Sequence, residues 1–566
     1  MAIIWKLTPA PDIDCPLCSA HESAQLFLQI TVGYFPDRHF ELYRCLNCRS
    51  CFFPNVSVPD YSLTLTTDLI KHYSEVGAGL PFILEPIIAV RNQNSRKTVL
   101  DVGCSFGYSI DFASKVLNWQ AIGVEPSSIG AVGMQALGVK IYNDYLEDVV
   151  DLSGRSFGVV YSSEVIEHAS EPQKFVRLLT QYLAPEGILV LTTPNAEYVE
   201  PGRTEAELIQ TLSPGYHLNL FSAFSLTELL KSNGLPFVTV LQKDGSNLVV
   251  CAARHELTAF SNQVGEPYRE YLELRTEGSR DNFVYDGFAY RLFFELIAAS
   301  EYDRAFSFWD RWAPDLCCAY PKSMNPWDLI WLESARSFQV FGESAPYFIV
   351  GLFYCLAVLH INHLRRYELA ARYASAGFII AKQFISDHPH MAGQTTQLLW
   401  KLKFTEGLAQ LLFGRPDLAI SAFTEVTDHE QDGFSGVRPQ ADVIVDTSYQ
   451  LAMAWCQTSE EGNAAAALRR VAADCNVVLA GDAVMKLAQL RARQRENDLA
   501  VLAGSLRESY LAASIDFGPS LRRGIDESGQ RDKRAAPDDK WANRLPWDGV
   551  SAILKGLYRR LTSRAG

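Results

Sequence analysis

The sequence predicts a multidomain protein with three folded parts: a small cysteine-rich ribbon, an α/β domain built on a seven-stranded sheet, and an all-α solenoid. Three patterns indicate this order. Paired cysteines occur in residues 1–78, apolar strands alternate with amphipathic helices over residues 79–255, and the pattern is almost wholly helical over residues 256–515. A chain of 566 residues is too long for one hydrophobic core, so roughly three or four units are expected.

The composition limits the function classes. With 48% hydrophobic and 20% charged residues, the chain can bury a sizeable core. The formal net charge of −14 argues against a nucleic-acid partner, because neutralising phosphates needs a basic surface. The start of the chain shows no signal peptide, so a cytoplasmic protein is expected. The longest apolar run, APYFIVGLFYCLAVLHINH, is shorter than the ~20 residues of a spanning helix, which predicts a buried helix.

The first part carries the cysteine pairs Cys15/Cys18 and Cys45/Cys48, each in a Cys-x-x-Cys spacing. Five of the twelve cysteines lie in the first tenth of the chain, and disulfides are rare inside cells, so the clustering indicates a structural zinc site with four thiolate ligands. Between the pairs, LFLQITVGYFPDRHFELYRC alternates as the β-hairpin of a zinc ribbon would. Reduced thiols without metal are the alternative, and whether the spare Cys51 competes with Cys48 stays open.

The second part, residues 79–255, contains the candidate strands TVLDVG, AIGVE, VKIYN, FGVVYSS, GILVLTTP, PFVTVLQ and NLVVCAA. Helical patterns separate most of them, which predicts a largely parallel sheet covered on both faces. The last two strands are joined by KDGS. That connection is too short for a crossover helix, so an antiparallel hairpin is expected there.

The third part contains four phrases that resemble one another: EYDRAFSFW, RYELAARYA, RPDLAISAF and GNAAAALRRV. Around the third phrase, Gly407, Gly414, Ala419 and Phe423 stand where a tetratricopeptide unit has its small and aromatic packing residues. The region therefore resembles a tetratricopeptide-like solenoid, which could bind a protein partner.

The chain ends in a polar segment, residues 516–540, and a candidate amphipathic helix, residues 541–566. The polar segment is expected to be a flexible linker. The helix combines an apolar face with flanking cations, so it could attach the protein to a membrane surface, for example the inner membrane, or to a partner, or it could pack back on the solenoid. The face and its cations are Val550, Ile553, Leu554, Leu557, Tyr558, Leu561, Lys555, Arg559, Arg560 and Arg564.

A glycine-containing turn in TVLDVGCSFGYSIDFA points to cofactor chemistry. Gly103 and Gly107 would let a ligand approach the backbone, and the start of the following helix favours a carboxylate or phosphate. Downstream, AIGVEPSS ends the second strand in Glu125, a carboxylate suited to a ribose diol. Together these features predict a nucleoside-containing cofactor.

The turn does not fit the dinucleotide fingerprint, but it is similar to the GxGxG turn of class I S-adenosylmethionine-dependent methyltransferases, with Ser105 in place of the middle glycine. The resemblance covers residues 79–255 and implies a Rossmann-like sheet. It also implies that Asp101 contacts the amino-acid portion of the cofactor indirectly, that Glu125 binds the ribose hydroxyls, and that Asp144 or Tyr145 lies near the adenine.

The stretch VVYSSEVIEH places Glu164, Glu167 and His168 at the end of the fourth strand, where ligands bind in open α/β sheets. A helical turn would put all three on one face. With His217, the set resembles the magnesium site of RNA 3'-terminal 2'-O-methyltransferases, which implies Mg²⁺ here. The alternatives are that His168 or His217 is a general base, or that the acids merely stabilise a helix dipole.

The leading functional hypothesis is methyl transfer to a hydroxyl of a sugar or glycan in polysaccharide or lipopolysaccharide biosynthesis. A zinc ribbon before this type of domain resembles bacterial sugar methyltransferases, a group that also includes sugar C-methylation. The alternatives are O-methylation of a quinone-like small molecule, or a scaffold protein with a degenerate methyltransferase domain.

Overall fold

The structure is a computed structural model that describes residues 2–10, 12–33, 35–57, 67–76, 79–93, 95–203, 205–258, 260–261, 265–277, 283–458 and 460–473. The predicted end of the solenoid, the linker 516–540 and the amphipathic helix 541–566 lie outside the described residues. The chain divides into two compact units, each described by itself. One comprises Met1–Leu292 and Ser337–Phe348, and the other comprises Phe293–Arg336 and Ile349–Gly566.

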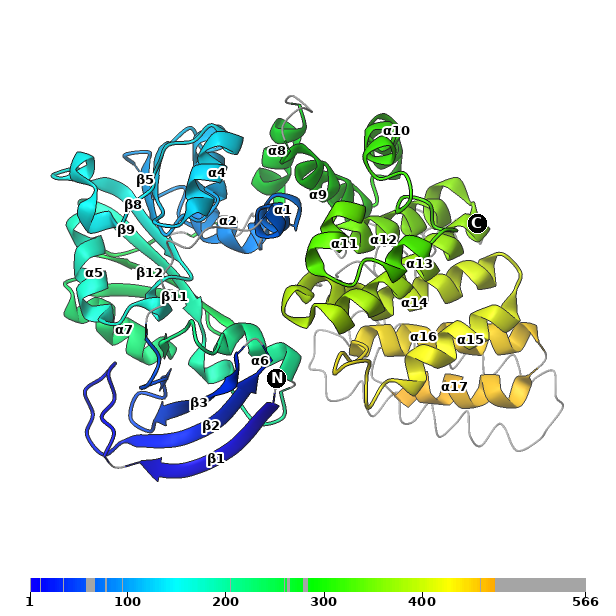
Figure 1. The fold of residues 1–566 in the computed structure, drawn as a ribbon, viewed down its shortest axis with the longest axis horizontal. Helices are drawn as coiled ribbons and strands as arrows, with labels where there is room; N and C mark the ends of the chain where they lie inside the picture. Colours follow the sequence, from blue (N-terminus) through cyan, green and yellow to red (C-terminus); the bar gives the residue numbers. More distant parts are fainter. Residues whose placement is uncertain are drawn as a thin grey trace, which may run out of the picture. The chain divides into compact units, whose positions relative to one another are not determined.

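The first unit is built on the seven-stranded sheet that the sequence predicts (Figure 1). Its strands are β5 (Thr98–Val102), β6 (Gln120–Val124), β7 (Ile141–Tyr142), β8 (Phe157–Ser163), β9 (Leu183–Pro194), β11 (Phe237–Gln242) and β12 (Asn247–Ala253). The spatial order is β11-β12-β9-β8-β5-β6-β7. Strands β5 to β9 run parallel, whereas β12 pairs antiparallel with both β9 and β11. The predicted terminal hairpin is therefore confirmed.

Two groups of helices cover this sheet. On one side α2 packs against α3 and α3 against α4, and on the other α5 packs against α7 and β9. The helices and short turns between residues 67 and 232 are α1 (Thr67–Val76), α2 (Leu80–Ala89), α3 (Tyr108–Lys115), α4 (Ser128–Leu137), η1 (Leu146–Asp148), η2 (Val150–Leu152), η3 (Ile166–His168), α5 (Pro172–Gln181), η4 (Ala196–Tyr198), α6 (Glu205–Leu212) and α7 (Ala223–Ser232). Because helices cover both faces, β8 is buried from Phe157 to Ser162 and reads as a continuous apolar run.

The N-terminal ribbon shares its sheet with the α/β domain. Its strands are β1 (Ala2–Ala10), β2 (Ala24–Val32), β3 (Phe35–Cys45) and β4 (Cys51–Phe52), and the sheet order β1-β2-β3-β4 continues into β10 (Asn219–Leu220). The predicted hairpin is the antiparallel β2–β3 pair. The predicted boundary at residue 78 does not separate two sheets, because β4 and β10 pair across it.

The structure also differs from the boundary predicted at residue 255. Helix α8 (Gly265–Thr276) packs on the α/β domain, where Arg275 Nε donates to Asp111 Oδ2 at 2.7 Å and Arg275 Nη2 donates to the Leu137 carbonyl at 2.9 Å. Tyr271 also donates its hydroxyl to the Asp111 carboxylate. The first compact unit accordingly continues to Leu292, within α9 (Tyr285–Ala298), and takes in α11 (Phe338–Ser344).

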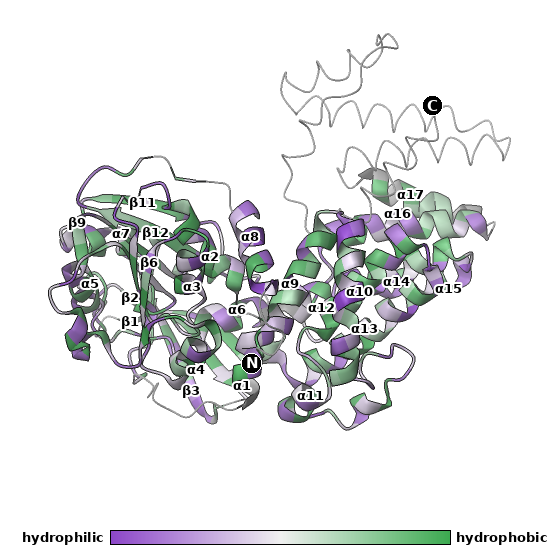
Figure 2. Ribbon diagram, turned by 90° about the horizontal axis from the view of Figure 1, so that it is seen from above, coloured by the Kyte–Doolittle hydropathy of each residue, from purple (hydrophilic) through white to green (hydrophobic). Residues whose placement is uncertain are grey.

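The described part of the second unit is helical, as predicted. Its elements are α10 (Tyr302–Ala319), η5 (Ile330–Glu333), α12 (Ile349–Leu359), the π-helical turn η6 (His360–Leu364), α13 (Tyr367–Asp387), η7 (Pro389–Met391), α14 (Gly393–Leu412), α15 (Pro416–Asp428), α16 (Ala441–Gln457) and α17 (Glu461–Ala473). Outer helices such as α15 carry hydrophilic and hydrophobic residues along one ribbon (Figure 2).

Two details of this unit correspond to patterns in the sequence. Helix α12 is buried at every residue, so the predicted buried helix is confirmed. A Cβ added to Gly407 would lie 2.5 Å from the Phe423 ring, so α14 and α15 approach closely where the tetratricopeptide pattern has its packing pair. The tetratricopeptide assignment itself stays a prediction. Among the described residues no single helix is long and apolar enough to span a membrane, although the bent pair Phe338–Ser344 and Ile349–Leu364 meets that test by length and composition alone.

Candidate active site

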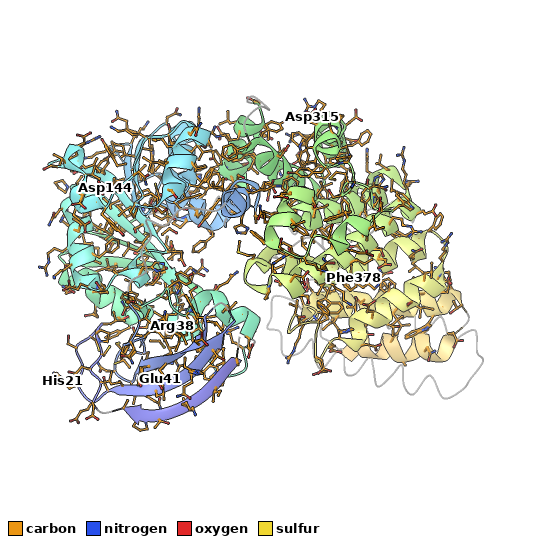
Figure 3. All side chains as sticks on the ribbon, in the orientation of Figure 1. His21, Arg38, Glu41, Asp144, Asp315 and Phe378 are labelled. Atoms are coloured by element: carbon orange, nitrogen blue, oxygen red, sulfur yellow. The ribbon has the colours of Figure 1, made fainter. Side chains whose placement is uncertain are left out.

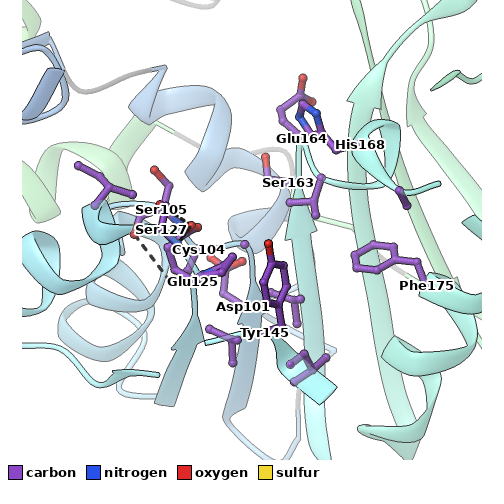
Figure 4. A pocket seen from close by; sticks show the side chains of 18 of the residues that line it. Asp101, Cys104, Ser105, Glu125, Ser127, Tyr145, Ser163, Glu164, His168 and Phe175 are labelled. Carbon is purple, nitrogen blue, oxygen red and sulfur yellow. Dashed lines mark hydrogen bonds between the residues drawn. The ribbon is translucent and has the colours of Figure 1, made fainter. Parts of the chain in front are cut away.

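A cavity of about 810 Å³ opens at the carboxyl ends of β5, β6 and β8, the edge of the sheet where ligands bind in this kind of fold (Figure 4). The residues predicted for cofactor binding that line it are Asp101, Gly103, Ser105, Glu125, Asp144 and Tyr145. Ser163, Glu164 and His168 line the same cavity. One space therefore joins the predicted cofactor site to part of the predicted catalytic set.

Both glycines in the turn after β5 have a left-handed backbone and no room for a side chain. Gly103 has φ +77°, and a Cβ there would lie 2.4 Å from Val165 Cγ2. Gly107 has φ +86° and precedes α3, where a Cβ would lie 2.9 Å from Ile141 Cδ1, so it shapes the turn from behind the cavity. Ser105 also has a left-handed backbone, with φ +50°, which explains why a glycine stands there in the family that this turn resembles.

Glu125 ties the turn after β5 to the loop after β6. Its Oε2 accepts from the Ser105 amide at 2.9 Å, while its Oε1 accepts from the Ser127 amide at 2.9 Å and the Ser127 hydroxyl at 2.6 Å (Figure 4). The side chain borders the cavity with 8% of its residue surface exposed. Each carboxylate oxygen can accept more than one hydrogen bond, so Glu125 is suited to a ribose diol while it holds the turn.

The other cofactor candidates lie on either side of Glu125. Asp101 is buried at the end of β5 and accepts a hydrogen bond from Ser109. Burial raises the pKa of Asp101 to about 7. Its Oδ1 has no hydrogen-bond partner among the described residues. Asp144 accepts from the Tyr145 amide, and the Tyr145 ring is half-exposed at the cavity wall, where it could stack on an adenine (Figure 4).

The structure does not bring the four predicted catalytic residues together as one set; they are Glu164, Glu167, His168 and His217. The sequence predicts the first three on one face of a helical turn. Ile166–His168 form a single tight turn, and Glu164 precedes it with φ +55°. Glu164 accepts from Thr192 Oγ1 and Asn247 Nδ2, each at 3.0 Å, and burial raises its pKa to about 7. Glu164 therefore lies outside the group that Glu167, His168 and His217 form, although it lines the same cavity as His168.

Glu167, His168 and His217 form a compact cluster, whose donor atoms all lie within 4.8 Å of one another. Glu167 Oε1 lies 3.8 Å from His168 Nε2 and 4.0 Å from His217 Nε2. Glu167 Oε2 accepts from Thr193 Oγ1 at 3.0 Å, whereas Oε1 is buried with no hydrogen-bond partner among the residues described.

The histidine tautomers follow from their other contacts. His168 Nδ1 lies 3.0 Å from the Tyr216 carbonyl, and His217 Nδ1 lies 3.0 Å from the Thr211 carbonyl. A carbonyl only accepts, so both Nδ1 atoms carry the hydrogen, and the two Nε2 atoms lie 3.8 and 4.0 Å from Glu167 Oε1. The His168 ring also contacts the backbone carbonyl of Glu164. Burial lowers the pKa of His168 and lowers that of His217 to about 3, and it raises the pKa of Glu167 well above its usual range. Either a proton on the Glu167 carboxylate or a bound cation would give Glu167 Oε1 and the two Nε2 atoms a partner.

The kinds of ligand atom in this cluster show how well it fits Mg²⁺, the ion that the sequence predicts. Two imidazole nitrogens and one carboxylate oxygen converge in this cluster, whereas Mg²⁺ prefers oxygen donors. Imidazole suits zinc, iron, nickel or copper better. The residues therefore fit a divalent transition metal better than Mg²⁺. The alternative of acids serving a helix dipole fits less well, since the Glu164 and Glu167 carboxylates bind Thr192, Thr193 and Asn247 side chains.

The four predicted zinc ligands gather in the ribbon. Cys15 Sγ lies 3.7 Å from Cys48 Sγ, and Cys18 Sγ lies 3.6 Å from Cys45 Sγ. Two thiolates bound at about 2.3 Å to one tetrahedral ion would lie about 3.8 Å apart, so the spacing fits a single zinc ion. Cys51 is not in this group and accepts a hydrogen bond from Arg44 Nε at 3.4 Å.

The two cysteine pairs adopt the same local fold. The residue after each pair has a left-handed backbone, with φ +56° at Ser19 and +64° at Arg49. Each of these residues donates its amide to the carbonyl of the first cysteine in the pair, at 2.9 Å. Such repeated turn geometry places two sulfurs on one side of the backbone, as a metal site requires.

Comparison with known proteins agrees with this geometry. Residues 75–240 match the family model described as a methyltransferase domain. The chain is 35% identical over 121 residues to a ubiquinone biosynthesis O-methyltransferase of Rickettsia canadensis, covering 20% of this chain and 50% of that protein. It is 30% identical over 171 residues to a probable S-adenosylmethionine-dependent methyltransferase of Mycolicibacterium smegmatis, covering 30% of this chain and 63% of that protein.

The chain thus carries a class I S-adenosylmethionine-dependent methyltransferase domain with a Rossmann-like sheet of seven strands. It spans less than two thirds of the length of either curated relative. Among solved structures it is similar to the sugar N-methyltransferase KedS8 from Streptoalloteichus sp., with a TM-score of 0.26 and 19% identity over 36% of this chain and 98% of that one.

Proposed function

We propose that this protein transfers the methyl group of S-adenosylmethionine to a hydroxyl group of a sugar or glycan in polysaccharide or lipopolysaccharide biosynthesis. The observation that carries the proposal is the single cavity that runs from the Gly103 turn and Glu125 to Glu164 and His168. A cofactor held at the first end would present its methyl group toward the second.

The chemistry follows from the state of the histidines. The acceptor oxygen attacks the methyl carbon as the carbon–sulfur bond breaks, which leaves S-adenosylhomocysteine. The proton of the hydroxyl must then be taken up. His168 Nε2 carries a lone pair, and burial lowers the pKa of His168, so the ring is neutral and ready to accept a proton near pH 7.

A divalent cation held by Glu167, His168 and His217 would supply the alternative chemistry, by lowering the pKa of a coordinated hydroxyl. The two roles exclude each other at His168, because one lone pair on Nε2 cannot bind a metal and accept a proton at the same time. Chelation therefore distinguishes a metal-assisted reaction from general-base catalysis by an imidazole.

The glycan acceptor is supported by the resemblance of the ribbon and methyltransferase combination to bacterial sugar methyltransferases. A quinone-like phenol is the second candidate, favoured by the similarity to ubiquinone biosynthesis O-methyltransferases. Incubation with carbon-13 methyl-labelled cofactor and separate panels of nucleotide sugars, lipid-linked glycans and catechols tests both. A labelled O-methyl sugar supports the first acceptor, and a labelled catechol alone replaces it with the second. A protein that binds no cofactor would leave only the scaffold hypothesis.

The remaining parts of the chain have separate proposed roles. The four gathered cysteines support a structural zinc ion in the ribbon. The helical region would bind a protein partner, as tetratricopeptide-like solenoids do. The protein would be cytoplasmic, and residues 541–566 would hold it peripherally at the inner membrane, where lipid-linked glycans are made. Co-sedimentation with anionic liposomes tests the last role, since a chain ending at Lys540 should sediment less than the full chain.

A further inference from the structure

The histidine cluster depends on one segment outside the parallel sheet, residues 213–222, called here the histidine loop. This loop carries His217, and its Tyr216 carbonyl fixes the tautomer of His168. The Leu218 amide donates to the Glu167 carbonyl at 2.9 Å, and Asn219 Nδ2 donates to the Ala169 carbonyl at 2.9 Å. The positions of Glu167, His168 and His217 thus all depend on where the loop lies.

The end of the N-terminal sheet that carries the four cysteines contacts the second half of the loop, residues 218–222. Strand β4 pairs with β10, and the Phe53 amide donates to the Leu218 carbonyl at 2.9 Å. Ser222 Oγ donates to the carbonyl of Cys48 at 2.6 Å, and the Ser222 amide donates to Ser50 Oγ at 3.1 Å. Cys48 belongs to the four-cysteine cluster, so the metal site connects to the loop through its own backbone.

The tip of the β2–β3 hairpin holds the first half of the loop. Gly215 has φ +93°, and a Cβ there would lie 2.6 Å from Phe35 Cε2 and 3.3 Å from Phe40 Cζ. The Phe35 and Tyr216 ring centroids are 6.0 Å apart. The guanidinium carbon of Arg38, labelled in Figure 3, lies 5.2 Å from the centroid of Phe35 and 4.9 Å from that of Phe40. The aromatic tip therefore packs directly against the backbone that sets the His168 tautomer.

We propose that the ribbon is a clamp that holds the histidine loop at both ends and so positions His168 and His217 for methyl transfer, with Phe35 as a positioning residue. This inference rests on the proposed function for its role in turnover. The cofactor side has its own bonds, from Glu125 to Ser105 and Ser127, so loosening the clamp should spare cofactor binding. A reacting group displaced by about 1 Å can lower the rate about a hundredfold.

The test uses the full chain with Phe35→Ala, with Phe35→Leu as the conservative variant and Ile4→Ala as the matched control. Ile4 lies on β1 of the same sheet and is 55% exposed. Zinc content and affinity for S-adenosylmethionine should be equal in all four proteins. In Phe35→Ala, turnover should fall about tenfold to a hundredfold, with Phe35→Leu recovering most of it.

Two further readouts do not depend on turnover. Hydrogen exchange measured by mass spectrometry should speed up at least tenfold in peptides from residues 213–222 of Phe35→Ala, but not in peptides from residues 98–125. Nitrogen-15 spectra of histidine-labelled protein should show the Nδ1-protonated tautomer of His168 in the parent protein and a mixture of tautomers in Phe35→Ala. The His168 resonance is assigned by its loss in His168→Ala.

Unchanged exchange and an unchanged tautomer in Phe35→Ala would overturn the clamp, whatever the turnover. Equal acceleration in Ile4→Ala, or equal acceleration of residues 98–125, would also overturn it, because the effect would then be general destabilisation. If the parent protein methylates no acceptor, the proposed function fails, while exchange and tautomer still decide whether the ribbon positions the histidines.

Discussion

Replacing Glu125 with alanine should weaken cofactor binding more than any surface substitution. Glu125 accepts hydrogen bonds from Ser105 and Ser127 and borders the cavity. Hydrogen bonds to a charged group contribute about 1.5 to 3 kcal/mol each. Two ribose hydroxyls at the lower value give about 3 kcal/mol, or about a hundredfold in affinity, and water filling the site reduces this. We therefore expect a loss of at least tenfold in Glu125→Ala.

Calorimetric titration with S-adenosylmethionine and with S-adenosylhomocysteine measures this loss. Glu228→Ala is the control, because Glu228 lies on α7, is half-exposed, and forms a surface pair with Lys231. Glu125→Gln separates charge from size, and thermal unfolding of each variant shows whether the turn has collapsed. An affinity of Glu125→Ala within a factor of two of the parent protein would refute the assignment of Glu125 to the ribose.

Three further predictions concern other parts of the chain. Purified protein should contain one equivalent of zinc, lost in Cys15→Ser with unfolding of the ribbon; less than a tenth of an equivalent after metal-replete expression would contradict the site. His168→Ala or His217→Ala should lower turnover about a hundredfold, and activity that survives exhaustive chelation would leave an imidazole base rather than a metal. Burial raises the pKa of Glu75 to about 7 from a usual 4.5, so the folded state binds this proton more tightly than the unfolded state. Its stabilising contribution, on the order of 3 kcal/mol, is complete below pH 4.5 and is lost as pH rises through 7. Denaturant titrations of Glu75→Gln should therefore show a free energy of unfolding that depends less on pH than in the parent protein. An identical pH profile would contradict this.

The parts of the fold that the sequence predicts well are those whose cause is local. Strands buried on both faces, such as β8, read as near-continuous apolar runs because neither face meets water. The four-residue KDGS connection leaves no room for a crossover, so the hairpin of β11 and β12 follows from length alone. Cysteine pairs of fixed spacing bring their sulfurs together through their own turns, and the gathering of the four cysteines was predictable for that reason.

Features that depend on distant contacts could not be predicted in this way. Arg275 meets Asp111 across 164 residues of sequence, and no local pattern at residue 255 marks that helix α8 belongs to the first unit. The left-handed backbone of Glu164 turns its carboxylate to Asn247, although a glutamate gives no sign of such a conformation. Strand β10 is two residues long, so its pairing with β4, and with it the link between ribbon and His217, has no periodicity to detect.

A crystal structure of the full chain with S-adenosylhomocysteine is the most direct measurement of the central claim, that one cavity joins the cofactor site to Glu164 and His168. We expect the ribose hydroxyls on Glu125, the adenine beside Tyr145, and the sulfur facing the side of the cavity that holds Glu164 and His168. Cofactor bound outside this cavity, or bound with its sulfur turned away from His168, would contradict it.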